Sequence, residues 1–236
     1  MQAALEQALR EPAQRVRRIA AGGQVIWLKQ AEELSLRLRI FKGDSLRGLD
    51  ADRRGLHAFA AHGLPVAPLL AEGPRYLATA EVGSPMHLLM ADGEPGPERD
   101  AAMRAAAMAL AEVHRAGLTH GRPKLRDICW DGKAARFIDL ERFDPRRRGG
   151  VWMAMDLVIL LHSIIDLARD LPPEADLVLD TWLAHAPPEA LEGLRVLRRR
   201  FGWCDGAIRL WHRITPGARE LIAARHLLDW PALARV

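Results

Sequence analysis

The most informative segment of the chain runs from Val113 to Glu141 and reads VHRAGLTHGRPKLRDICWDGKAARFIDLE. It contains the end of an alanine-rich helix, a loop that starts at His120, and two short strands joined by an Asp-Gly turn. Asp127 stands before the first strand, and Asp139 follows the apolar end of the second. Both carboxylates stand where they can cap turns.

The residues before this segment predict a small antiparallel sheet with one helix. Polar and apolar residues alternate along several short stretches, and Gly22-Gly23 offers a tight turn between the first two. A helical pattern of apolar residues ends at Gly63, which is typical of a glycine C-cap. We expect strands at 15–20, 24–29, 34–40, 66–70 and 75–81, a helix at 49–62, and a turn at 72–74.

The residues after the sheet are predominantly helical. We expect amphipathic or buried helices at 98–115, 151–167, 187–200 and 216–228, with the two-stranded ribbon between the first two. This order predicts an α+β fold with two lobes, an N-terminal lobe at 1–81 and a larger helical lobe at 82–236.

The composition indicates an ordered protein and argues against a nucleic-acid partner. Of the 236 residues, 49% are hydrophobic and 27% charged, which supplies ample material for a core. The 34 basic residues exceed the 30 acidic ones by only four, which is a weak field for binding nucleic acid. Only four of the basic residues are lysines, so each lysine is a candidate for a specific role.

A cytoplasmic location is expected. Cys129 and Cys204 are far apart, which favours two reduced thiols over a disulfide or zinc site. Residues 1–12 carry acids and lack the apolar segment of a secretory signal. The longest strongly apolar stretch, Leu157–Ile165, is too short to cross a bilayer, which takes roughly 20 residues.

The informative segment resembles the catalytic and metal-binding loops of the protein-kinase-like fold. In the bacterial small-molecule and lipopolysaccharide (heptose/Kdo) kinases, this stretch reads LH-x-x-G-x-x-HGD-x-x-x-x-N, a short hairpin, and then ID. The matching residues here are His114, Gly117, His120, Gly121, Asp127 and Ile138-Asp139. The resemblance implies a bilobal atypical kinase that binds ATP with Mg²⁺. It also implies that Asp127 and Asp139 are the metal ligands, since hard cations prefer oxygen, with turn capping as the alternative for both. The kinase would transfer a phosphoryl group to a hydroxyl, for which a lipopolysaccharide core sugar is the expected acceptor.

The resemblance also implies roles for residues outside this segment. Lys29, in VIWLK, stands where the family places the lysine that anchors the nucleotide, and Lys42 is its rival. An exposed lysine at a strand end is the alternative for Lys29. Glu81-Val82-Gly83 match the hinge whose backbone would read adenine. Asp156 lies within an apolar helix and is expected to hold the catalytic loop, and His120 is expected to be structural beside Asp139.

The segment departs from the family at the catalytic base. Arg122 replaces the usual aspartate two residues after His120, and a guanidinium cannot accept a proton in a protein. Three alternatives follow. The chemistry is lost, and the protein is a pseudokinase that binds nucleotide or acts as a scaffold; a weak base is sufficient for the reaction; or another carboxylate acts as the base. The candidate carboxylates are Asp127, Glu141 and Asp144.

The predicted N-terminal helix also departs from the family. It lacks the glutamate that would pair with the nucleotide lysine, and Asp52 is a possible substitute.

Two arginine runs, 146–148 and 198–200, have two interpretations. Such runs usually form solvated faces, and the alternative is contact with phosphorylated sugars or anionic lipid headgroups. The second interpretation would place the protein at the periphery of the inner membrane.

Overall fold

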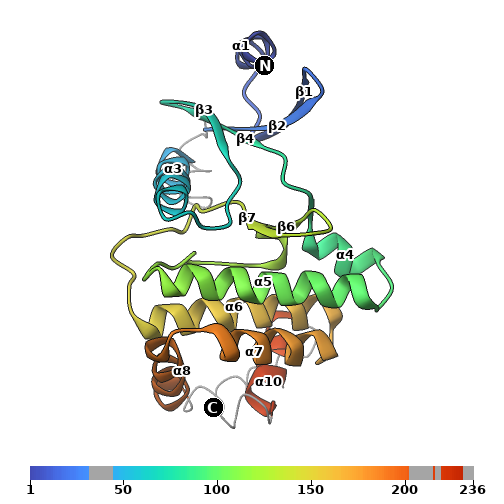
Figure 1. Ribbon diagram of the computed structural model, residues 1–236, viewed down its shortest axis with the longest axis vertical. Helices are drawn as coiled ribbons and strands as arrows, with labels where there is room; N and C mark the ends of the chain where they lie inside the picture. Colours follow the sequence, from blue (N-terminus) through green and yellow to red (C-terminus); the bar gives the residue numbers. More distant parts are fainter. Residues whose placement is uncertain (32–44, 202–214, 216–218, 231–236) are drawn as a thin grey trace. The chain divides into compact units, whose positions relative to one another are not determined.

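The structure is a computed structural model that describes residues 1–31, 45–201, 215 and 219–230 (Figure 1). Its contacts divide the chain into two compact units. The first comprises Met1–Val82 together with Ile138–Phe143, and the second comprises Gly83–Phe137 and Asp144–Val236. A short segment from the middle of the sequence therefore belongs to the N-terminal unit.

The N-terminal unit contains a four-stranded antiparallel sheet in the order β1-β2-β4-β3. Gly22 and Gly23 close the β1–β2 hairpin with φ values of 59° and 79°, the backbone that a tight hairpin turn requires. The predicted hairpin is therefore confirmed. The strands are β1 (Val16–Ala21), β2 (Gln24–Gln30), β3 (Leu69–Gly73) and β4 (Tyr76–Ala80).

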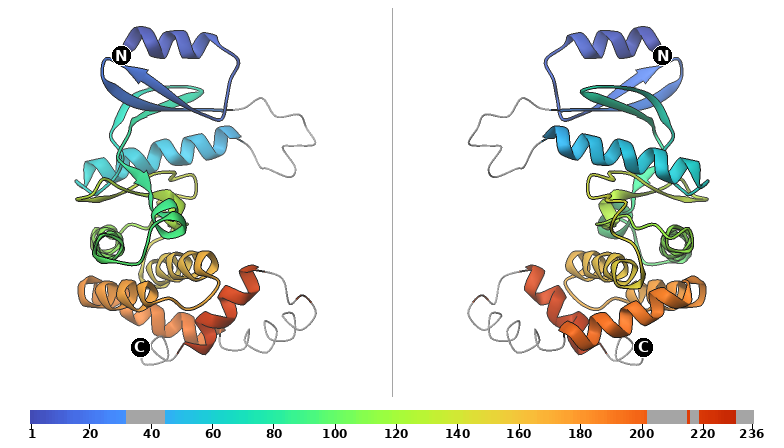
Figure 2. Two further views of the ribbon diagram at one scale, coloured as in Figure 1. Left: turned by 90° about the vertical axis from the view of Figure 1, so that its right-hand side faces the viewer. Right: turned by 90° about the vertical axis from the view of Figure 1, so that its left-hand side faces the viewer.

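Two helices cover opposite faces of this sheet, as Figure 2 shows. Helix α3 (Ser45–Ala61) agrees with the predicted helix and starts four residues earlier. Helix α1 (Gln2–Arg10) was not predicted, since only two of its nine residues, Leu5 and Leu9, carry large apolar side chains. Leu5 and Ala8 of α1 nevertheless pack into the apolar cluster on the sheet.

Two predicted boundaries in this unit were wrong. The strand expected at 66–70 lies at Leu69–Gly73, because Pro68 has no N–H to donate to a ladder. The turn is at Pro74 and Arg75 and not at 72–74. The strand expected at 34–40 lies outside the described residues.

The C-terminal unit is mainly helical, as predicted, with a small antiparallel sheet in the order β5-β6-β7. Helices α4 and α7 were not predicted individually. The sheet comprises β5 (Ser84–Pro85), β6 (Ile128–Trp130) and β7 (Ala135–Phe137). The helices are α4 (Met86–Asp92), α5 (Pro97–Arg115), the 3₁₀ helix η1 (Leu125–Asp127), α6 (Gly150–Ala168), α7 (Pro173–His185), α8 (Pro188–Phe201) and α10 (Arg219–Asp229).

Helix α6 forms the centre of this unit and packs against α7, α8 and α10. The helix has 19 residues and is therefore longer than the apolar stretch that was predicted to be too short to cross a bilayer. By length and composition, α6 could cross a membrane. That test is weak evidence, because core helices also pass it. Leu157, Leu160, Leu161 and Ile164 have no exposed surface, and Asp156 is also buried in the same helix, as expected for a core position.

Candidate nucleotide site

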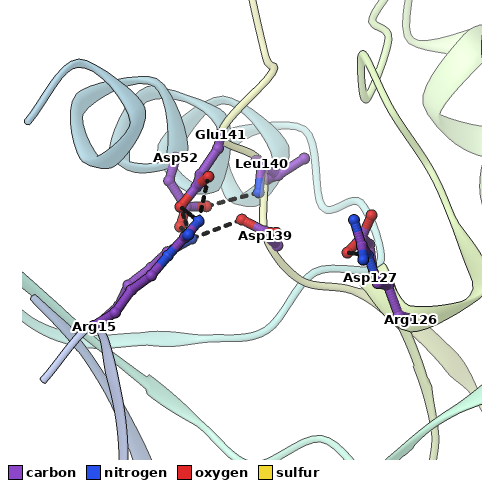
Figure 3. Close-up of polar contacts among 8 residues, drawn as sticks. Arg15, Asp52, Arg126, Asp127, Asp139, Leu140 and Glu141 are labelled. Atoms are coloured by element: carbon purple, nitrogen blue, oxygen red, sulfur yellow. Dashed lines mark hydrogen bonds and ion pairs between the residues drawn. The ribbon is translucent and has the colours of Figure 1, made fainter. Parts of the chain in front are cut away.

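The described residues of the N-terminal unit surround one lysine with three carboxylates. The Nζ atom of Lys29, on β2, lies 2.8 Å from an oxygen of Asp52 and 2.7 Å from one of Asp139. Glu141 forms a third ion pair with the same atom at 2.8 Å. Figure 3 shows the three carboxylates converging from α3 and from the segment after β7. The alternative of an exposed strand-end lysine was therefore wrong, since the Lys29 side chain is only 17% exposed.

Asp52 connects α3 to the segment 138–143. Its other carboxylate oxygen accepts the backbone N–H of Leu140 at 2.8 Å (Figure 3). Gly55, one turn further along α3, leaves space for Leu140, because a Cβ there would lie 2.6 Å from Leu140 Cβ. Phe143 also meets Phe59 of α3 edge to face. The segment that carries Asp139 is therefore fixed to α3 by polar and apolar contacts together.

Electrostatics keep Lys29 protonated. Burial alone would lower the pKa of Lys29, but the charges of Asp52, Asp139 and Glu141 outweigh burial and raise this pKa above its ordinary value. Burial also raises the pKa of Asp52, against the charge of Lys29 and the N–H of Leu140. The stability of the site thus depends on the lysine remaining charged.

The backbone at Asp139 is unusual. Asp139 has a φ of 59°, in the left-handed region that non-glycine residues seldom adopt and that aspartate tolerates better than most. Such conformations cost free energy and persist only where surrounding contacts impose them. Lys29 holds the Asp139 side chain, and Asp52 holds the next N–H along the chain. Asp139 remains 26% exposed, so solvent reaches its carboxylate.

Glu141 was predicted only as a substitute base, yet it is a central member of this cluster. Besides Lys29, it binds the guanidinium of Arg15, whose Nη2 lies 3.2 and 3.0 Å from its two oxygens. The sequence signal was Glu141 two residues after Asp139, where the related kinases carry glycine. Arg15 gave no signal, because 126 residues separate it from Glu141.

Asp156 organises the start of the loop in the C-terminal unit. Its oxygens accept the backbone N–H of His120 at 2.7 Å and of Gly121 at 3.0 Å. Asp156 is 1% exposed, and the Nε2 atom of His114 lies 3.6 Å from it. The Nδ1 atom of His114 accepts the indole N–H of Trp182, which places the proton of the neutral ring on Nε2. The loop backbone therefore rests on a buried polar group within an apolar helix.

His120, Arg122 and Asp127 lie along this loop. His120 is fully buried, and its ring packs against Phe137 at a centroid distance of 5.1 Å. The backbone N–H of Arg122 donates to Nδ1 of His120 at 3.4 Å. Asp127 is 3% exposed and accepts the Lys124 N–H at 3.4 Å, as the turn-capping alternative requires. Arg126 Nε lies 3.7 Å from its other oxygen. The catalytic and metal roles of Arg122 and Asp127 stay predictions.

The predicted hinge residues stand where β4 leaves the N-terminal unit. The N–H of Glu81 donates to the carbonyl of Val25, so this donor is unavailable to an adenine ring. Val82 is buried. Gly83 has a φ of 103°, and a Cβ there would lie 2.2 Å from the carbonyl oxygen of Trp130, so only glycine fits. Nucleotide binding by these three residues stays a prediction.

The remaining candidates belong to the C-terminal unit or lie outside the described residues. Lys42, the rival to Lys29, lies outside the described residues, as does Cys204. Asp144 receives two bonds from the Arg146 side chain, and these lower its pKa to about 2, which makes it a poor base. Arg147 lies over the ring of Trp152 at 5.0 Å. The arginines of the second run, 198–200, are exposed on α8.

Solved structures identify the fold. The structure of macrolide 2′-phosphotransferase MphH from Brachybacterium faecium matches 98% of this chain and 99% of its own, with a TM-score of 0.52 at 15% identity. The chain has a protein-kinase-like fold. This fold confirms the predicted α+β class with a small N-terminal antiparallel sheet and a larger helical part.

Other similarities are weaker. WbdD, solved with the kinase inhibitor LY294002, matches 74% of this chain with a TM-score of 0.48 and 15% identity, and the chain spans 45% of its length. An uncharacterized protein of Haemophilus influenzae is 23% identical over 185 residues, covering 77% of this chain and 75% of its own. No family model matches the sequence.

Proposed function

We propose that the protein is an atypical kinase that transfers the γ-phosphoryl group of ATP to a hydroxyl. The observation that supports this proposal is the bonding of Lys29 to Asp52 and Asp139, within a protein-kinase-like fold. In such a fold, a charged lysine at this position would pair with phosphate oxygens of the nucleotide. Phosphoryl transfer also needs a carboxylate for a metal ion, and the segment that follows β7 carries one.

Mg²⁺ fits the residues expected to hold it. Among the residues that the structure describes, no group of three or more His, Cys, Asp or Glu is arranged to hold a metal. Mg²⁺ does not need such a cage, since it commonly takes one or two carboxylates, waters and substrate phosphates. Asp139, whose carboxylate is 26% exposed, would be its protein ligand in the N-terminal unit, and the metal role of Asp127 stays a prediction. When bound, the ion would neutralise charge on the phosphates.

In the proposed reaction, the bond between the γ-phosphorus and the oxygen of ADP breaks and a bond to the acceptor oxygen forms. The acceptor proton passes to solvent or to a phosphoryl oxygen, because Arg122 cannot accept it. The reaction can proceed without a general base because its transition state is loose, so that positioning and charge neutralisation contribute most of the catalysis. Arg122 would instead offer its planar donors to an anionic group.

The acceptor in this proposal is a sugar hydroxyl, with a lipopolysaccharide core sugar as the first candidate. The sequence resemblance to lipopolysaccharide kinases supports it. The fold is also compatible with small-molecule acceptors, since its relative MphH is named a macrolide 2′-phosphotransferase. Cytoplasmic location, with peripheral contact at the inner membrane, belongs to the same proposal.

Nucleotide binding tests the proposal. ATP with Mg²⁺ should raise the melting temperature, because a ligand that binds only the folded state adds about 2.7 kcal/mol of stability at one hundred times its Kd. Lys29→Ala and Asp139→Asn should each abolish the shift, whereas the exposed Lys133 provides a matched control as Lys133→Ala. A shift that survives in both site variants would contradict the assignment. Transfer of labelled phosphate to core extracts then tests the acceptor.

A pseudokinase is the second candidate, and the observation that favours it is Arg122 at the usual base position. It predicts nucleotide binding without transfer. Arg122→Asp distinguishes the kinase from the pseudokinase, because it restores a carboxylate at the usual base position. Transfer by the wild type that Arg122→Ala abolishes would exclude the pseudokinase.

A further inference from the structure

The ammonium group of Lys29 has as many partners as hydrogens. Oxygens of Asp52, Asp139 and Glu141 lie 2.8, 2.7 and 2.8 Å from Nζ, and an ammonium carries three hydrogens. A phosphate oxygen can therefore reach Lys29 only if one of these carboxylates withdraws.

The cluster also carries an excess of negative charge. With Arg15 included, two cations face three carboxylates, so a nucleotide phosphate would approach a net anionic group. Because solvent access to the cluster is limited, this repulsion is screened less than in bulk water. Withdrawal of one carboxylate would restore a neutral pairing between Lys29 and the phosphate.

Glu141 is better placed to withdraw than Asp52. Asp52 is buried and also holds the N–H of Leu140, so its departure would release the segment 138–143. Glu141 has a second cationic partner, because Arg15 already contacts both of its oxygens. Figure 3 shows Arg15 reaching Glu141 beside the Asp52 and Asp139 carboxylates. Glu141 can thus leave Lys29 and remain ion-paired.

We propose that Glu141 competes with nucleotide phosphate for Lys29 and so sets the nucleotide affinity, with Arg15 retaining Glu141 when the nucleotide binds. This inference rests on the proposed function, because it takes Lys29 as the phosphate anchor. Glu141 is then a specificity-determining residue: a ligand binds well only if its phosphates displace a charged carboxylate.

The test measures the dissociation constants of ADP without metal and of ATP with Mg²⁺, by calorimetry on the full chain. Glu141→Gln keeps the shape and removes the charge, so it should tighten both by about tenfold. Glu72→Gln is the matched control, since Glu72 pairs with Arg53 and His57 in the same unit, and it should change neither constant. A thermal melt confirms that each variant is folded.

A double-mutant cycle tests the role of Arg15. Arg15→Ala should weaken nucleotide binding in the wild-type background, because Glu141 loses its second partner. It should have little effect in the Glu141→Gln background, where no charge needs to be retained. Equal weakening in both backgrounds would show that Arg15 contacts the nucleotide itself and would overturn this part of the inference.

The outcomes separate this inference from the proposed function. Wild-type binding with no gain in Glu141→Gln refutes the inference alone. A loss of affinity in Glu141→Gln only when Mg²⁺ is present would make Glu141 a metal ligand and also refutes it. No nucleotide binding by the folded wild type and Glu141→Gln alike refutes both.

Discussion

Each unit contains a buried aspartate that holds a loop by its backbone, but the two aspartates are balanced differently. Asp52 accepts one N–H, from Leu140, and its other oxygen forms an ion pair with the charged side chain of Lys29. Asp156 accepts two N–H groups, from His120 and Gly121, with the neutral ring of His114 nearby. One loop is therefore held partly through an ion pair, and the other through backbone bonds alone.

The difference separates a part that can respond to a ligand from a part that cannot. Lys29 is partly accessible and shares its charge among three carboxylates, so an anion can redistribute these pairs. Within the described part of the chain, Asp156 has no comparable partner to exchange, and its N–H donors would be left buried without it. We expect ligands and pH to act on the first site and mutations to act most strongly on the second.

The largest effect should follow from Asp156→Ala. Two backbone N–H groups would lose their acceptor inside the C-terminal unit, at a cost of roughly 2–4 kcal/mol in the free energy of unfolding. Chemical denaturation measures this loss. Asp180→Ala, an exposed position on α7, should change stability by less than about 0.5 kcal/mol. Equal effects of the two variants would contradict the backbone role of Asp156.

Lys29→Met should come next, because it leaves the buried Asp52 without its countercharge. We expect the free energy of unfolding to fall by roughly 1–3 kcal/mol at pH 7, since the substitution leaves partly buried carboxylate charges without a counterion. The loss should shrink as the pH falls toward 4, where the carboxylates become protonated and need no cation. Melting temperatures of both proteins across pH 4–8 check this, and parallel profiles would be the contrary result.

At alkaline pH, the wild type should lose the stability that the charged Lys29 contributes. Because the folded pKa of Lys29 lies above its ordinary value of 10.5, the stability that it contributes is complete below pH 10.5. It is lost only as the pH rises through the higher folded value. The stability difference between the wild type and Lys29→Met should therefore stay constant up to about pH 10.5 and narrow at higher pH.

Gly55→Ala should have a smaller effect that sharpens the contrast within one helix. The added methyl would lie 2.6 Å from Leu140 Cβ, so the segment 138–143 must shift, at a cost of about 1–2 kcal/mol. Gly48→Ala, on the same helix with 3.6 Å to the nearest atom, should instead stabilise by up to about 1 kcal/mol. Denaturation of the pair measures both, and a stabilising Gly55→Ala would show that Leu140 moves freely.

The smallest effect should follow from Asp131→Ala, a carboxylate in neither network. Asp131 bonds Arg136 and two N–H groups of its own turn, and these contacts lower its pKa to about 2. Its contribution is present above about pH 4 and is lost as the pH falls toward 2. Since the residue is solvent-accessible, removal should cost no more than about 1 kcal/mol at pH 7. A larger loss, or one independent of pH, would contradict this assignment.

The sequence was most predictive where chemistry restricted the choices. A carboxylate within an apolar helix must be hydrogen-bonded, which directed attention to Asp156. The scarcity of lysine made Lys29 a candidate, and the resemblance to the kinase-like fold placed Lys29 at the nucleotide lysine and Asp52 in place of the missing helix glutamate. Asp156 carried an unusual cost and Lys29 an unusual rarity, which only a specific contact explains.

The sequence was least predictive where partners meet through the fold. The contact of Arg15 with Glu141 joins residues 126 positions apart, and neither residue type is unusual locally. Helix α1 was missed because it is short and carries only two large apolar side chains, and it gains its stability from the sheet that it covers. Strand β3 was displaced because the lack of a donor at Pro68 outweighs the apolar pattern.

The assignment of Ile138–Phe143 to the N-terminal unit has a consequence for how the chain is made. As the protein leaves the ribosome, the sheet and α3 emerge long before Leu140 and Phe143. Until then Asp52 lacks its backbone donor and Phe59 lacks its aromatic partner. The N-terminal unit therefore cannot mature during its own synthesis, and a nascent chain that stops at Val82 should remain vulnerable to proteases that the finished protein resists.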